Sequence, residues 1–158
     1  MIYFNCDYLE GGHPKILEKM LSTNMEQLTG YSTDHYCDSA RERIRQACGC
    51  PDADVHFLVG GTQTNLTAIA SILRPYQGVL AAHDGHIACH ETGAIEATGH
   101  KVLPIPCVDG KITADQVREF CHSHQTNTMR EHMVQPGACY ISHPTENGTL
   151  YTKAQLEE

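Results

Sequence analysis

The sequence predicts an α/β protein built on a parallel sheet. From about residue 55 onward, short continuous apolar runs alternate with segments of helical periodicity, and this alternation is typical of parallel α/β folds. Polar clusters follow three of the expected strands, at residues 60–65, 83–86 and 143–147. Because ligands of such sheets bind beyond the carboxyl ends of the strands, these clusters predict one shared site.

Residues 1–50 predict an N-terminal arm and two helices, ahead of a sheet that begins within residues 51–158. Pro14 in a first turn, followed by apolar residues at helical spacing, predicts the first helix. Asp38 is expected to cap the second helix and Gly49 to end it. The inner face of that helix is expected to carry Ala40, Ile44, Ala47 and Cys48.

The stretch from Val55 to Asn65 predicts a buried strand, a tight turn and a helix start. Gly60 and Gly61 allow a ligand to approach the backbone, and threonine hydroxyls lie beside the free N–H groups of the helix. Such an end carries a partial positive charge that suits a phosphate. The alternative is a turn that requires glycine and a threonine cap but binds nothing.

The later elements follow the same periodicities. Strands are expected over residues 79–82, 101–105 and 137–142, and a helix over about 89–98 that ends at Gly99. Thr113 and Thr152 are expected to cap two further helices. A turn is expected at 109–111, and a polar, weakly patterned loop or frayed helix end at 123–135.

Composition argues against several classes of protein. The chain of 158 residues has a net charge of −8 and no basic cluster, which disfavours a nucleic-acid-binding surface. No apolar run approaches the roughly 20 residues that span a bilayer. The N-terminus has neither the basic start nor the long apolar stretch of a signal peptide. We therefore expect a cytoplasmic protein that binds neither nucleic acid nor membrane.

The chain contains eight cysteines, at positions 6, 37, 48, 50, 89, 107, 121 and 139. They are scattered and include no Cys-x-x-Cys pair, so no zinc finger or zinc ribbon is indicated. We expect most of them to be small, buried, reduced core residues.

A metal-dependent hydrolase is a weaker interpretation of the histidines. His86 and His90 are four residues apart, and His83 or Asp84 could add a ligand. Residues 121–124, Cys-His-Ser-His, are a second and weaker candidate. The metalloprotease order His-Glu-x-x-His is absent, so no metal is expected.

Several short runs occur together in one order: residues 4–8 with Gly11 and Pro14, 30–31 with Asp34, 60–65, 84–87, 91–94 and 145–149. This ordered set resembles the threonine aldolase and β-eliminating lyase family, over essentially the whole chain. The resemblance implies the three-layer parallel-sheet large domain of the aspartate aminotransferase type. It also implies a pyridoxal 5′-phosphate cofactor, an amino-acid substrate, and a homodimer or homotetramer in which the dimer completes each site.

The resemblance assigns roles to particular residues. Gly61, Thr62 and Gln63 match the turn that holds the cofactor phosphate. His86 matches a histidine on the face of the pyridine ring, where a flat imidazole stacks and keeps a nitrogen for proton transfer. Glu91 matches a family glutamate near the ring.

Three positions depart from the common family pattern. His90 stands where many threonine aldolases have a tyrosine, and Glu146 where they have a second histidine that handles the substrate hydroxyl. Cys6 stands where a serine near the substrate carboxylate is common. We expect Cys6 and His90 to bind substrate, and Glu146 to act as a base beside His86. The expected reaction is threonine-type cleavage to glycine and an aldehyde, with β-elimination from another amino acid as the alternative.

None of the five lysines has the setting that the resemblance implies for a Schiff-base lysine; they are Lys15, Lys19, Lys101, Lys111 and Lys153. Only six residues follow Thr152, and so short a helix is marginal by itself. We therefore expect the N-terminal part of the large domain, without its remainder or the small C-terminal domain, and inactive alone. A non-catalytic assembly partner is a further alternative.

Overall fold

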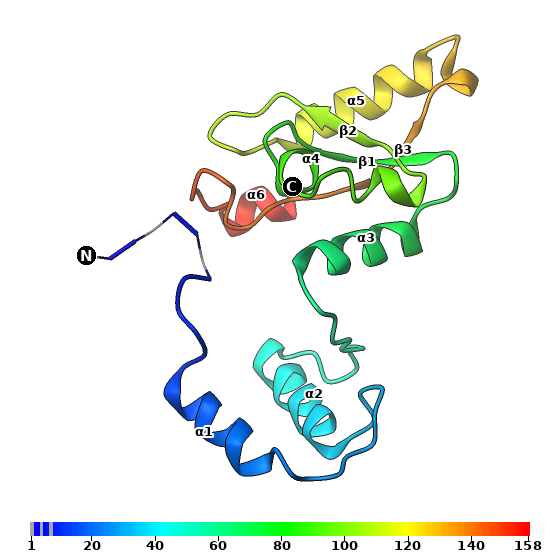
Figure 1. Cartoon of the computed structure of the whole chain (residues 1–158). Helices are drawn as coiled ribbons and strands as arrows, with labels where there is room; N and C mark the ends of the chain where they lie inside the picture. The colour runs from blue at the N-terminus through cyan, green and yellow to red at the C-terminus, as the bar shows by residue number, and fades with distance from the viewer. Residues whose placement is uncertain (1, 4, 7) are drawn as a thin grey trace. The chain divides into compact units, whose positions relative to one another are not determined.

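The computed structural model describes residues 2–3, 5–6 and 8–158 (Figure 1). These residues group into two compact units, one ending at Phe57 and the other comprising Leu58–Glu158. Phe4 and Asp7, which belong to the first of the ordered motifs, lie outside the described residues. No described helix has the length and apolar character needed to cross a membrane.

The first unit contains helices α1 (Pro14–Thr23) and α2 (His35–Cys48), as the sequence predicts. The expected cap at Asp38 is wrong, because α2 begins at His35 and Asp34 is its N-cap, so Asp38 lies within the first turn of the helix. The Asp34 carboxylate accepts the main-chain N–H groups of Tyr36 and Cys37, each at 3.0 Å. Gly49 ends α2 in the left-handed conformation, at φ 64°.

The expected apolar inner face of α2 is also wrong. All residues of α2 are described and none is buried; Ile44 is 39% exposed. Instead, Arg41 donates to the Ser32 carbonyl at 2.7 Å and Arg45 to the Ala53 carbonyl at 2.8 Å. The irregular backbone around α2 leaves carbonyl groups that need donors, and the guanidinium groups provide them.

Residues 55–59 do not form the expected buried strand. Their described backbone is irregular, and Val59 is 95% exposed. The Arg41 side chain donates to the Val55 carbonyl at 3.3 Å, and the Gln63 side chain accepts the Val59 N–H at 2.8 Å. A strand needs a neighbouring strand to satisfy its main chain, and the described part of the chain supplies none to this segment.

The second unit contains the predicted parallel sheet. Its strands are β1 (Gln77–Ala82), β2 (Val102–Ile105) and β3 (Gln135–Cys139), in the order β2-β1-β3. Both pairings are parallel, with Val79 opposite Val102 and Leu80 opposite Cys139. The prediction of a parallel α/β fold is therefore confirmed.

Alternating residues of β1 contribute to two separate cores. Val79 and Ala81 pack with residues of α3 (Gly61–Ile72) and α4 (His86–Cys89), whereas Leu80 and Ala82 lie in a core covered by α5 (Ala114–Thr126). The unit thus has three layers, with helices on both faces of the sheet (Figure 1).

One later expectation needs correction. The helix expected over 89–98 is replaced by α4 and a 3₁₀ helix, η1 (Glu96–Thr98). Thr92 and Gly93 between them have φ values of 51° and 74°, a left-handed conformation that a right-handed helix cannot include. Within residues 123–135, where the sequence allowed either a loop or a helix end, α5 continues to Thr126 and a second 3₁₀ helix, η2 (Arg130–His132), follows.

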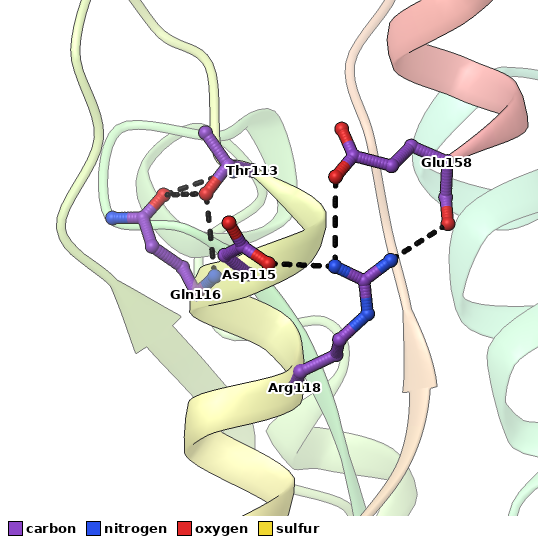
Figure 2. A network of polar contacts seen from close by, with 5 residues as sticks. All are labelled: Thr113, Asp115, Gln116, Arg118 and Glu158. Carbon is purple, nitrogen blue, oxygen red and sulfur yellow. Dashed lines mark hydrogen bonds and ion pairs between the residues drawn. The ribbon is translucent and has the colours of Figure 1, made fainter.

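The last helix, α6 (Lys153–Glu157), is joined to α5 by an exposed polar network. Arg118 binds the Asp115 carboxylate at 2.6 Å and the main-chain oxygen of Glu158 at 3.0 Å (Figure 2). Thr113 and Gln116 form a capping box at the start of α5, as the predicted cap at Thr113 requires. Thr152 forms the same type of cap on α6.

All eight cysteines are described and all are free thiols, but none is buried. The expectation that most of them belong to the core is therefore wrong. Aliphatic residues of the strands and facing helices fill both cores, so the cysteines lie at their margins or on the surface.

Replacing a residue of the first core tests the three-layer arrangement. Ile95→Ala removes a side chain that is 0% exposed, and we expect the free energy of unfolding in urea to fall by about 2–5 kcal/mol. Ile72→Ala, at a position that is 65% exposed, is the matched control and should change it by about 0.5 kcal/mol or less. Equal losses in the two variants would contradict the assignment of the core.

Candidate functional site

The start of α3 is open to a ligand. Gly61, Thr62 and Gln63 form its first turn and are exposed, and no described side chain caps the helix. The first N–H groups of an α-helix have no partner within the helix. A Cβ placed on Gly60 or Gly61 would meet no atom within 4 Å. This turn therefore combines free donors, a positive helix end and open space, which are the requirements for an anion.

His86 lies at the carboxyl end of β1 and is held by a carboxylate. The strand ends at Ala82, and His86 is the first residue of α4. The Oε1 atom of Glu91 lies 2.9 Å from Nδ1 of His86 and accepts a hydrogen bond from the Asn65 amide at 2.6 Å. Because Asn65 lies one turn after Thr62 on α3, these bonds connect His86 to the helix whose start is open.

The buried carboxylate of Glu91 determines which ring nitrogen of His86 is engaged in a hydrogen bond. Glu91 is 3% exposed, and its Oε2 atom has no hydrogen-bond partner among the described residues. Where this carboxylate is ionised it can only accept hydrogen bonds, and Nδ1 of His86 then carries the hydrogen of the pair. In the neutral ring, Nε2 is then free to accept a proton.

Glu146 and His90 lie at the same edge of the sheet. The Ser142 hydroxyl donates to Oε1 of Glu146 at 3.2 Å and accepts the main-chain N–H of His86 at 3.4 Å. The His90 ring centroid is 5.7 Å from that of His86. The structure thus brings together three predicted site residues, His86, His90 and Glu146, on segments that follow β1 and β3.

Sequence reasoning missed two contacts and left one residue unplaced. Asn65 lies next to the predicted phosphate turn, but its amide bonds to Glu91; its spacing from Thr62 places it on the same side of α3. Ser142 was not selected, although it ends the strand expected at 137–142. Cys6 is half-buried within the first unit, and its role near the substrate stays a prediction.

The fold and this edge define a parallel α/β protein in which an uncapped helix start is connected by hydrogen bonds to a paired imidazole. The chain belongs to the beta-eliminating lyase family, whose family model matches residues 4–158. The family that the ordered motifs resemble is thereby confirmed.

Known relatives agree with this membership. The low specificity L-threonine aldolases of Pseudomonas aeruginosa and of a Pseudomonas species are each 27% identical over 156 residues, which are 98% of this chain and 44% of theirs. A solved structure of threonine aldolase from Leishmania major is 51% identical, with a TM-score of 0.89 over 95% of this chain and 43% of its own. The chain therefore spans less than half the length of these relatives, and its aspartate aminotransferase-type α/β fold is confirmed.

A double-mutant cycle tests the connection between α3 and Glu91. Removing the amide in Asn65→Ala and the carboxylate in Glu91→Ala should show a coupling energy of about 1–3 kcal/mol in urea unfolding, because the hydrogen bond between them involves a charged group. Thr64→Ala is the control, since the Thr64 hydroxyl bonds to the Gly60 carbonyl. Its effect should add to that of Glu91→Ala within about 0.5 kcal/mol. Additivity in both cycles would contradict the described network.

Proposed function

We propose that this chain serves in a pyridoxal-phosphate-dependent lyase that acts on a β-hydroxy amino acid. The proposed reaction is threonine aldolase-like cleavage of the Cα–Cβ bond, giving glycine and an aldehyde. The observation that carries the proposal is the chain of hydrogen bonds from Asn65 through Glu91 to His86, next to an uncapped helix start. Relatives described as threonine aldolases support it.

The residues present fit this cofactor. The N–H groups of Gly61, Thr62 and Gln63 would hold its phosphate, because they are free, exposed and at the positive end of α3. The absence of side chains at Gly60 and Gly61 leaves room for a phosphate against the backbone. The half-buried His86 ring, held at Nδ1, offers a flat face for the pyridine ring.

The cofactor, when bound, supplies an electron sink for the bond broken at the amino-acid substrate. The residues of this chain would orient the cofactor and the substrate and would transfer protons during the reaction. Glu91 holds His86 in the tautomer whose Nε2 accepts a proton. Glu146 stands on a segment beyond β3, where its carboxylate would accept the proton of a substrate hydroxyl, and Cys6 and His90 would contact the rest of the substrate.

We also propose that the working protein is a cytoplasmic homodimer or homotetramer. Every residue of α1 is described and none is buried. Its exposed apolar side chains include Ile16, Leu17, Met20 and Leu21. Exposed apolar surface on one helix indicates that another surface covers it, and a second copy of the protein would provide one.

β-Elimination from another amino acid is the second candidate. It is supported by the description of the family as beta-eliminating lyases and by Glu146, which replaces the histidine common in threonine aldolases. Product analysis of protein expressed from its complete gene, with the cofactor added, distinguishes the two. L-Threonine should yield glycine and acetaldehyde in equal amounts. A 2-oxo acid and ammonium in their place would establish elimination and overturn the aldolase proposal.

The role of His86 can be separated into stacking and proton transfer. His86→Phe keeps a flat ring but removes both nitrogens, so we expect kcat to fall by about 10²–10⁴-fold, the usual contribution of a general base. His122→Phe, at an exposed position on α5, is the control and should retain the activity of the parent. Parental kcat in His86→Phe would show that the ring acts by stacking alone.

A further inference from the structure

A second cluster of ligand-type side chains lies at the carboxyl edge of the sheet. Among the described residues, His83, Asp84 and Cys107 form a group whose potential metal-binding atoms all lie within 4.8 Å of one another. His83 and Asp84 directly follow β1, and Cys107 lies two residues after the end of β2. The parallel pairing of these strands brings the two segments together. The sequence indicated His83 and Asp84 only as additions to the pair at 86 and 90, and it did not indicate Cys107.

The distances within the group suit coordination of one ion. The Cys107 sulfur is 3.3 Å from Nδ1 of His83 and 2.9 Å from Oδ1 of Asp84. In a tetrahedral zinc site the ligand atoms are about 3.3–3.6 Å apart, given metal–ligand bonds of about 2.0–2.3 Å. Small side-chain rotations would therefore bring the three atoms into such a site.

Neighbouring groups hold these side chains in place. The Asn147 amide donates to Oδ2 of Asp84 at 3.2 Å, which leaves Oδ1 directed to Cys107. The pKa of the Cys107 thiol is raised, mainly because the thiol is partly buried and secondly because the Asp84 carboxylate is close to it. The hydrogen bond from that thiol lowers the pKa of Asp84. The Cys107 thiol donates to Oδ1 of Asp84, so the sulfur and this carboxylate oxygen are directed toward one another.

We propose that His83, Asp84 and Cys107 bind one divalent transition-metal ion of the zinc type. Binding forms a metal–sulfur bond and releases the thiol proton to solvent. A thiolate and an imidazole favour zinc or cobalt over magnesium or calcium, which prefer oxygen ligands. The ion would connect the segment after β1 with the segment after β2. Its ligand His83 lies three residues before His86, and water completes the coordination. This inference does not rest on the proposed lyase activity.

Cobalt(II) is the probe, because a thiolate bound to cobalt gives a charge-transfer band in the near ultraviolet. Titration of the reduced chain should give a band that saturates at one equivalent and disappears when zinc is added. Cys107→Ser should abolish the band. His83→Gln, at an exposed position, should weaken cobalt binding by at least about 10-fold, since even outer-shell changes cost metal sites about 10–100-fold.

Cys89→Ser is the matched control, because the Cys89 sulfur bonds to the His83 carbonyl and is not among the three ligands. It should keep the band and the parental cobalt affinity. Thermal unfolding of each metal-free variant identifies any that does not fold, and His83→Gln then tests the site independently of the thiol. The proposal is overturned if the parent shows no band, if folded Cys107→Ser keeps it, or if Cys89→Ser loses it.

Discussion

The central position of β1 is the constraint on which the second unit depends. Among the described strands it has β2 on one side and β3 on the other, and residues 78–82 carry its buried surface. Because side chains alternate across a sheet, Val79 and Ala81 support one helical layer while Leu80 and Ala82 support the other. β1 pairs in parallel with both of its neighbours, so the segments after the three strands leave from one edge, where the candidate site forms.

Two candidate sites with different ligand preferences lie at this edge of the sheet. The start of α3 and the His86 imidazole, fixed by the buried Glu91, suit an anion and a flat ring. The thiol, imidazole and carboxylate of residues 107, 83 and 84 suit a cation. The two sites therefore prefer ligands of opposite charge, although Asp84 and His86 are separated only by Gly85. Ser142 and Asn147, on the segment after β3, contact the backbone of His86 and the carboxylate of Asp84 respectively.

Most elements could be predicted because their signals act over a few residues. Pro14, Thr113 and Thr152 mark helix starts through bonds or fixed dihedral angles within one turn. The predictions were wrong where the local structure depends on contacts with residues far away in the sequence. Residues 55–59 have the composition of a strand but lack a neighbouring strand among the described residues. On α2, the arginines bond to loop carbonyls, which helical periodicity cannot anticipate.

The sequence by itself determined the parallel α/β class, the family, and the candidate phosphate turn and imidazole, because motif order and local periodicity are properties of the chain. Only the tertiary structure decided which side chains meet. Asn65 and Glu91 are 26 positions apart, and Asp84 and Cys107 are 23 apart. Contacts at such separations depend on how the layers pack and on strand order. The burial of Glu91, whose carboxylate contacts Nδ1 of His86, is likewise a consequence of packing. No local pattern specifies which side chains lose contact with water.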